Sequence, residues 1–217
     1  KASSHKAIRG LLAQCNALIT SFTPSVAFLI LPSNGQPGIT SSLSRILSLQ
    51  PRSQSDLVTL SYALDVLTAC LRVHSSDQTI RIVLDAISAP VFKVLSYHEF
   101  GLQTFTPPAG VTQSESAFKT YSKHFDLARN TCMESMLSLL KCVISHRSGV
   151  TLLCDKLSYE QSIVEDLGIL VSIEVLPSFV RESASHILEM LATMVTNDIS
   201  LESILIPTSS SKFIIDL

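Results

Sequence analysis

The chain of 217 residues contains no tryptophan, and only 6% of its residues are aromatic. All-β domains usually depend on aromatic and β-branched side chains that alternate along their strands. Almost no sustained alternation of this kind occurs here, whereas apolar residues recur often at helical spacing. The scarcity of aromatic residues therefore counts against an all-β fold and favours an all-α one.

Charge is also scarce, since 16% of the residues are charged and 46% are hydrophobic. A typical soluble domain has about 25% charged residues. This composition excludes a disordered tail, which needs low hydrophobicity and high charge. The net charge of −2 hides an asymmetry. Residues 1–55 contain five cations and no acid, whereas residues 155–202 contain nine acids and two cations.

Long apolar runs are missing as well. The longest, Val26–Leu31, has six residues, and a membrane-spanning helix needs about 20. The N-terminal residues 1–9 are polar and lack the apolar centre of a signal peptide. We therefore expect no contact with a membrane.

The cysteines fit neither a disulfide framework nor a zinc site. They are odd in number, no two have the spacing C-x-x-C, and they are Cys15, Cys70, Cys132, Cys142 and Cys154. Most fall on apolar helix faces, where a free cysteine acts as a small hydrophobic residue. This predicts a reducing, intracellular location, cytoplasmic or nuclear.

Motifs of catalysis are absent. The chain has no phosphate-binding loop, dinucleotide fingerprint, nucleophile elbow or H-E-x-x-H. Its six histidines are scattered without metal-ligand spacing, and we expect His74 and His146 to cap helix ends. Glu165 and Asp166 are adjacent, so on a helix they point about 100° apart and form no catalytic pair. We therefore predict no enzyme, no catalytic residues, no cofactor and no metal.

Helical periodicity predicts a series of helices separated by polar turns. The expected ranges are 4–21, 41–49, 55–73, 77–88, 90–97, 117–145 in one or two pieces, a helix after a turn at 147–149, 159–175, 177–195 and a short 201–205. The clearest stripe is Leu57, Leu60, Leu64, Leu67 and Leu71. Ser55-Asp56 and Ser75-Ser76-Asp77 are the expected N-caps of two of these helices. Residues 22–38 are an expected loop, in which Val26–Leu31 forms a buried turn of helix, and residues 97–116 are an expected inserted or mobile loop.

Three of the expected helices share a pattern. The segments 63–71, 136–144 and 187–195 align so that Leu64, Leu137 and Leu188 form one column. Leu67, Leu140 and Leu191 form a second column, and a short polar turn follows each segment. The offsets of 73 and 51 residues are irregular, as in degenerate helical repeats.

A family resemblance rests on the last of these segments. Residues 177–192, PSFVRESASHILEMLA, and the later Asn197 resemble the third helix of an armadillo repeat, and 149–153, GVTLL, resembles the start of the next unit. The resemblance implies an armadillo/HEAT-like α-solenoid, with residues 1–217 as one domain. Because the chain lacks an initiator methionine and ends abruptly, we interpret it as a fragment of a larger protein.

In armadillo domains of the importin-alpha type, third helices carry a ladder of Trp and Asn. The matching columns here hold Tyr62, Ser135 and His186 in place of Trp, and Val66, Leu139 and Met190 in place of Asn. The resemblance therefore implies a surface for an apolar or helical ligand rather than for a basic peptide. The alternative is that flanking repeats or a loop cover these residues. The expected partner-binding residues are Tyr62, Val66, Ser135, Leu139, Cys142, His186, Met190 and Thr193.

These observations predict a non-catalytic protein–protein interaction scaffold that binds a partner peptide or helix, with self-association as a further possibility. One alternative is a structural segment within a larger helical scaffold. Another is a nucleic-acid-associated solenoid that uses the basic N-terminal part. Lys119, Lys123 and Arg129, interleaved with Tyr121 and Phe125, could touch phosphates, but nearby Asp126 and the modest charge count against nucleic acid.

Overall fold

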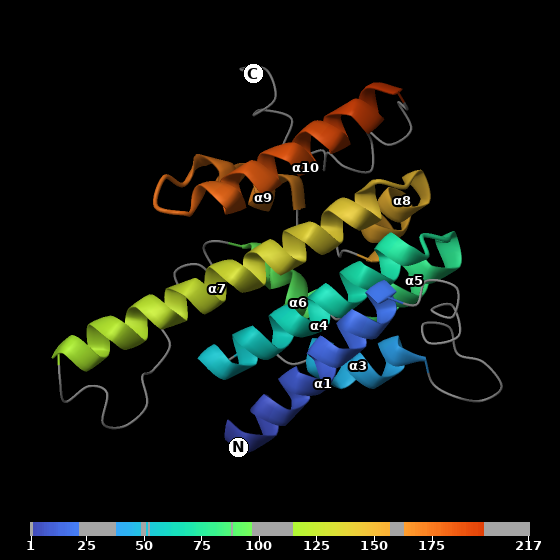
Figure 1. The fold of residues 1–217 in the computed structure, drawn as a ribbon. Helices are drawn as coiled ribbons and strands as arrows, with labels where there is room; N and C mark the ends of the chain where they lie inside the picture. The colour runs from blue at the N-terminus through green and yellow to red at the C-terminus, as the bar shows by residue number, and fades with distance from the viewer. Residues whose placement is uncertain are drawn as a thin grey trace.

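The computed structural model describes residues 2–21, 38–48, 51, 53–87, 89–96, 115–156 and 163–197. All regular structure in these ranges is helical, so the all-α prediction is confirmed. The four longest helices are α1 (Ala2–Ser21), α4 (Gln54–Val73), α7 (Glu115–Ile144) and α10 (Ser178–Asn197). They pack in chain order, α1 on α4, α4 on α7 and α7 on α10, and all run in the same direction (Figure 1). We call these four helices the long-helix layer.

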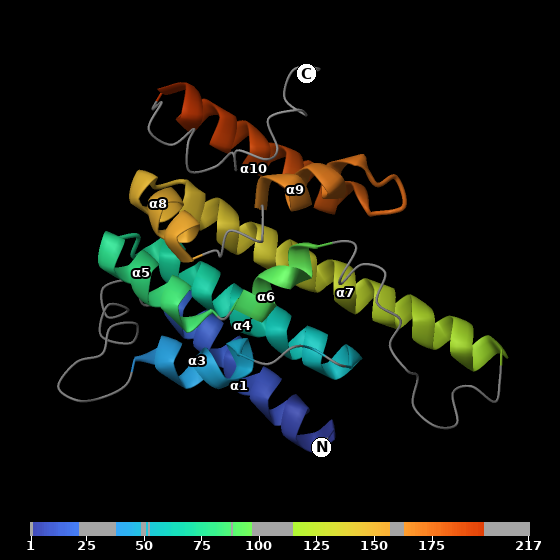
Figure 2. The ribbon, with the colours of Figure 1, turned by 180° about the vertical axis from the view of Figure 1, so that it is seen from behind.

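Shorter helices form a second layer, which faces the viewer in Figure 2. They are α3 (Ile39–Leu47), α5 (Asp77–Ala86), α6 (Ala89–Phe92), the 3₁₀ turn η2 (Lys93–Leu95), α8 (Arg147–Lys156) and α9 (Ile163–Ser172). Within this layer α5 packs against both α3 and α8. Towards the first layer, α3 contacts α4, α8 contacts α7 and α9 contacts α10. A helix of the long-helix layer can therefore bury apolar residues against two long neighbours and one short helix.

The core is continuous through both layers. The predicted leucine stripe of α4 is fully buried, since Leu57, Leu64 and Leu67 have no exposed surface and Leu60 and Leu71 are 2% exposed. The predicted stripe is thus confirmed. Ile80, Val83 and Leu84 of α5 and its C-cap residue Ile87 are buried as well.

The N-caps differ in how well the sequence predicted them. Ser76 caps α5 as expected, because its hydroxyl accepts a hydrogen bond from the Thr79 N–H. At α4, however, the cap is Ser53, whose hydroxyl accepts from the Asp56 N–H at 3.2 Å. The prediction of Ser55-Asp56 was wrong by two residues, because Ser53 is also a good N-cap three residues before an acid.

Helix α7 is one piece of 30 residues and begins at Glu115. Nothing within it breaks the helix, because residues 115–144 contain neither glycine nor proline. The expected loop over 97–116 therefore ends before Glu115 and Ser116, which are helical. The rest of that loop, 97–114, lies outside the described residues, as do Val26–Leu31 and the expected helix 201–205.

The turn after α7 is shorter than expected. It consists of Ser145 and His146, and α8 already begins at Arg147, so the predicted turn at 147–149 was wrong. The reason lies at Gly149, which is buried against the end of α7. A methyl group at Gly149 would overlap the carbonyl oxygen of Val143. Glycine thus serves here as a point of close helix approach inside a helix rather than as a turn residue.

The three segments aligned in sequence lie on neighbouring helices α4, α7 and α10. Leu67, Leu140 and Leu191 are all buried, at 0, 1 and 4% exposure, and so occupy comparable core positions. In the other column Leu64 and Leu137 are buried, whereas Leu188 is half-buried. Pro177 immediately precedes α10, close to the first-turn position expected for it.

No helix among the described residues is long and apolar enough to cross a membrane.

Candidate functional site

The eight residues predicted to bind a partner do not form one accessible surface. Val66, Ser135 and Leu139 are 0, 5 and 1% exposed, so a partner cannot touch them in this structure. They lie on α4 and α7, the two helices with the most extensive contact. The alignment gives comparable positions along the helix axes for these residues. It does not predict that they face the contact between α4 and α7, where they are buried in the core. For these three residues the prediction of a binding surface needs correction.

The other five predicted residues are accessible to different degrees. Tyr62, His186 and Thr193 are exposed, and Cys142 and Met190 are half-buried. His186 lies 3.9 Å from Glu189, measured between Nδ1 and Oε2. All five lie on α4, α7 or α10, so they remain candidates for contact with a partner on the long-helix layer.

Exposed large apolar side chains gather on the same layer. The described residues of this kind are Leu11, Leu18, Tyr62, Phe118, Leu127, Val175 and Phe179. Six of them lie on α1, α4, α7 or α10, and Val175 lies in the turn between α9 and α10. Within the described residues, the shorter helices carry none. This asymmetry between the two layers is the strongest sign of a docking surface on the molecule.

Sequence reasoning missed Leu127 and Phe179 as surface residues, although Leu127 is 61% exposed. A signal was present for Leu127. It lies two positions from Phe125 and one from Ala128, both buried, and a helix turns residues at those offsets away from the buried face. A search for apolar stripes finds rows of apolar residues along one helix face. It therefore overlooks a single apolar residue, such as Leu127, on the face opposite the core.

Two half-buried carboxyl groups lie where neighbouring long helices meet. Asp65 of α4 accepts a hydrogen bond from Ser135 of α7. Glu134 of α7 accepts from the Ser183 hydroxyl of α10, at 3.3 and 3.4 Å to its two oxygens. A serine thus joins a carboxyl group across each of two successive helix contacts.

Both carboxyl groups have a raised pKa. Burial is the main cause for Asp65, and the Ser135 hydrogen bond and the Arg72 charge lower its pKa by less. Burial also dominates for Glu134, against smaller lowering effects of Ser183 and Lys141. Because burial disfavours the charged form, each of these acids makes the fold more stable when protonated.

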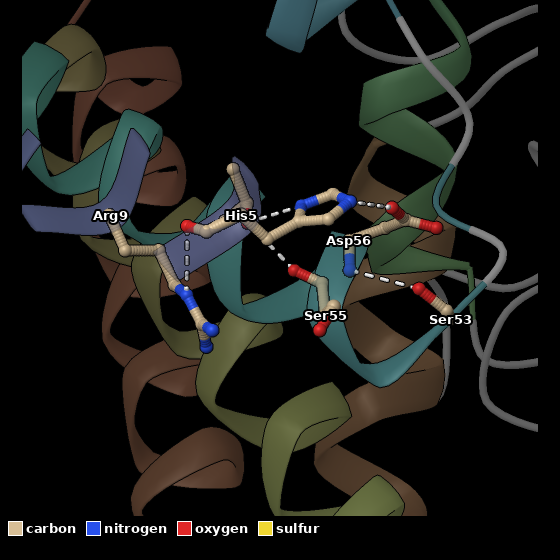
Figure 3. Close-up of polar contacts among 6 residues, drawn as sticks. His5, Arg9, Ser53, Ser55 and Asp56 are labelled. Carbon is tan, nitrogen blue, oxygen red and sulfur yellow. Dashed lines mark hydrogen bonds and ion pairs between the residues drawn. The ribbon is translucent and has the colours of Figure 1, made fainter. Parts of the chain in front are cut away.

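A polar cluster fastens the start of α1 to the start of α4 (Figure 3). His5 Nδ1 lies 3.2 Å from the Thr59 hydroxyl oxygen, and His5 Nε2 lies 3.6 Å from Asp56 Oδ1. Arg9 Nε donates to the His5 carbonyl at 3.2 Å. Beside this cluster lies a cleft of about 340 Å³, lined by Ser4, His5, Ile8, Ile46, Pro51, Asp56, Thr59 and Leu60.

An acid, an imidazole and a hydroxyl together suggest a catalytic triad, but their hydrogen bonding does not fit one. In a triad the hydroxyl must donate its proton to the imidazole. Here the Thr59 hydroxyl donates to the Ser55 carbonyl at 2.7 Å, and Thr59 is 4% exposed. The oxygen therefore accepts from His5. The arrangement fits a structural connection between α1 and α4 better than a nucleophile.

The basic stretch of α7 carries less free charge than its sequence suggested. Lys119 pairs with Glu115 at 2.7 Å, and Arg129 pairs with Asp126 at 3.1 Å. Tyr121 stacks on Phe125 of the same helix, with ring centroids 6.4 Å apart, so these two rings pack against each other. Two of the three cations that could touch phosphates are thus already balanced by carboxylates.

The two histidines expected at helix ends are found there. His74 follows α4, and its main-chain N–H donates to the Cys70 carbonyl at 2.9 Å. His146 follows α7, and its carbonyl accepts from the N–H groups of Gly149 and Val150. These hydrogen bonds are made by the main chain of each histidine.

Glu165 and Asp166 lie in the first turn of α9, where the negative charge of an acid interacts favourably with the helix dipole.

The described residues contain no group of three or more His, Cys, Asp or Glu side chains that could hold a metal ion. Cys15, Cys70, Cys132 and Cys142 are free thiols, and Cys154 lies outside the described side chains. Burial raises the pKa of both Cys70 and Cys132 to about 12. These two thiols are therefore unsuited to act as nucleophiles or metal ligands at neutral pH.

Comparison with known proteins adds no relative: no family model, no curated protein and no solved structure matches this chain.

Proposed function

We propose that this chain is a non-catalytic protein–protein interaction scaffold that binds a partner peptide or helix on the long-helix layer. The observation that carries the proposal is the concentration of exposed large apolar side chains on the long-helix layer. The proposed peptide-binding face is the part of this layer on α4, α7 and α10, which carries Tyr62, Phe118, Leu127 and Phe179. A face of this kind fits a partner that brings apolar anchors at helical or extended spacing.

We further propose that the helices form an armadillo/HEAT-like solenoid. Its support is the order of the four long helices, which pack in sequence and run in the same direction, together with the aligned leucines Leu67, Leu140 and Leu191. Stacked units of this kind bury a continuous core and leave an extended surface for binding.

The binding face can be tested with peptides selected from a displayed random library against the folded chain. Tyr62→Ala, Leu127→Ala and Phe179→Ala, combined, should weaken binding of the selected peptides by roughly tenfold to a hundredfold, because exposed aromatic and leucine anchors are lost. The matched control is Val175→Ala, which removes an apolar side chain that is 89% exposed outside the long helices.

Fluorescence anisotropy gives the dissociation constants, and circular dichroism establishes that each variant keeps its helices. Peptides that bind the triple variant as tightly as the original chain, or that lose affinity only with Val175→Ala, would contradict the proposed face.

A further inference from the structure

The outer face of α1 differs from an ordinary solvated helix face. Residues 10–21 of α1 contain no charged side chain. On the exposed side Ala7, Leu11, Gln14 and Leu18 follow one another at spacings of 4, 3 and 4, so they lie along one face. Leu11 is 62% exposed and Leu18 is 52% exposed. We call these four residues the α1 edge face.

The charges at the two ends of α1 are arranged unfavourably for an isolated helix. Lys6 and Arg9 lie in its N-terminal half, and the helix has neither an acid in its first turn nor a cation in its last. The N-terminus of a helix carries partial positive charge and the C-terminus partial negative charge. The cation Lys6 is therefore at the wrong end of its own helix, and the last turn of α1 supplies no cation for the C-terminal carbonyls.

A second copy of the same helix, packed antiparallel, supplies what each copy lacks. If the pairing centres between Gln14 and Cys15, Leu11 of one copy meets Leu18 of the other, and the reverse. The same register brings Lys6 of each copy to the C-terminal end of its partner's α1, where a cation is favourable. A parallel pairing would instead bring the cationic halves together.

We propose that this chain self-associates as a two-fold dimer in which the α1 edge faces of two copies pack antiparallel. A self-complementary patch of this kind closes after two copies and adds no further ones. A helix of 20 residues is about 30 Å long, and the proposed contact rests on Leu11 and Leu18 of each copy, so we expect it to bury less than the standard interface of about 1,600 Å². The dimer is therefore weak, with a dissociation constant in roughly the micromolar range.

Sedimentation velocity over roughly 1 to 500 μM protein tests the proposal, since this range brackets a micromolar dissociation constant. The chain should shift from monomer to dimer, with no larger species. Leu11→Glu combined with Leu18→Glu should raise the dissociation constant by roughly a hundredfold or more, since both leucines lose their apolar contact. The matched control is Leu127→Glu on α7, where the leucine is 61% exposed and the dimer should be unchanged.

Two further measurements test the role of the Lys6 charge and the antiparallel direction of the helix pair. Lys6→Glu should weaken the dimer by roughly tenfold, because the favourable contact with the helix end becomes unfavourable. Mixing a Leu11→Cys chain with a Leu18→Cys chain under mild oxidation should give the mixed disulfide in preference to either like pair.

A chain that stays monomeric throughout the range overturns the proposal. So does a dimer that Leu127→Glu disrupts as strongly as the α1 pair of substitutions, or a preference for disulfides between like positions. Peptide binding on α4, α7 and α10 uses other residues, so the α1 variants should bind the selected peptides as tightly as the original chain. A chain that binds these peptides but does not dimerise would therefore overturn the dimer and not the proposed function.

Discussion

Two helices of equal length, α1 and α4, show how position in the stack determines what an apolar helix can do. Each has 20 residues, and each was predicted as an amphipathic helix. In α4 twelve side chains are buried, from Leu57 to Leu71. Among the described side chains of α1 only Leu12 and Ile19 are buried, whereas Leu11 and Leu18 are more than half exposed.

The difference follows from the neighbours rather than from the composition of the helices. Helix α4 lies between α1 and α7 and is also covered by α3. Helix α1 packs extensively against α4 alone among the long helices described. A low proportion of charge thus has two consequences in one chain. It supplies a core where a helix has several neighbours, and it leaves apolar side chains exposed where a helix has one.

The largest expected effect separates the two helices directly. Leu67→Ala in α4 should lower the free energy of unfolding by about 2–5 kcal/mol, because Leu67 has no exposed surface and its loss leaves a cavity. Leu11→Ala in α1 should change it by less than about 0.5 kcal/mol. Urea denaturation at submicromolar concentration, where the monomer predominates, measures both. Equal losses for the two variants would show that α1 is as well covered as α4.

The next effect concerns a close approach within the fold. Gly149→Ala should destabilise the protein by about 1–3 kcal/mol, because the added methyl group overlaps the Val143 carbonyl oxygen and α8 must shift. Gly168→Ala in α9 is the matched control. A methyl group at Gly168 would meet no atom within 4 Å outside the adjoining backbone of its own helix, so alanine there should stabilise the helix by roughly 0.5–1 kcal/mol. Thermal unfolding of both variants gives the comparison, and a stabilised Gly149→Ala protein would disprove the contact.

A smaller effect depends on pH. The pKa of Asp65 is raised above 3.8, and that of Glu134 is raised above 4.5. The stability that these groups contribute is therefore fully present below those ordinary values and is lost as the pH rises through the raised ones. Asp65→Asn and Glu134→Gln cannot ionise, so above these pH values the double variant should unfold at a higher urea concentration than the original chain.

Measuring the urea midpoint from pH 4 to pH 8 tests this prediction. The gap between variant and original chain should widen as the pH rises and then level off. A gap that narrows with rising pH would mean that the ionised carboxylates stabilise the contacts between α4, α7 and α10.

The last prediction concerns the reactivity of the thiols in the unaltered protein rather than its stability. Cys70 and Cys132 are buried and have a pKa of about 12, so they should react slowly with iodoacetamide in the folded protein. Cys15 and Cys142 are half-buried and should react first. Mass spectrometry of timed samples gives the order of labelling. Early modification of Cys132 would indicate that the contact between α4 and α7 opens readily.

The sequence predicted most of the described helices because helix periodicity and capping are local properties. The leucines of α4 and the cap at Ser76 are examples. Boundaries failed where two local signals competed, as with Ser53 and Ser55. They also failed where a distant contact decided the outcome, as at Gly149, whose role depends on the Val143 carbonyl.

The candidate site was less predictable than the fold. Aligning helices fixes the position of a residue along the helix axis but not the direction in which a neighbour lies. Val66 and Leu139 were therefore expected at the surface and are buried where α4 meets α7. The polar cluster around His5 joins residues 54 positions apart, and no motif in the sequence marks such a pair.

Hydrogen exchange with and without a selected peptide tests most directly the claim that the long-helix layer binds the partner. Bound peptide should slow exchange in α4, α7 and α10 around Tyr62, Leu127 and Phe179. Exchange in α3, α5 and α8 should stay the same. Protection confined to α3, α5 and α8 would instead place the binding face on the layer of shorter helices and disprove the proposed function.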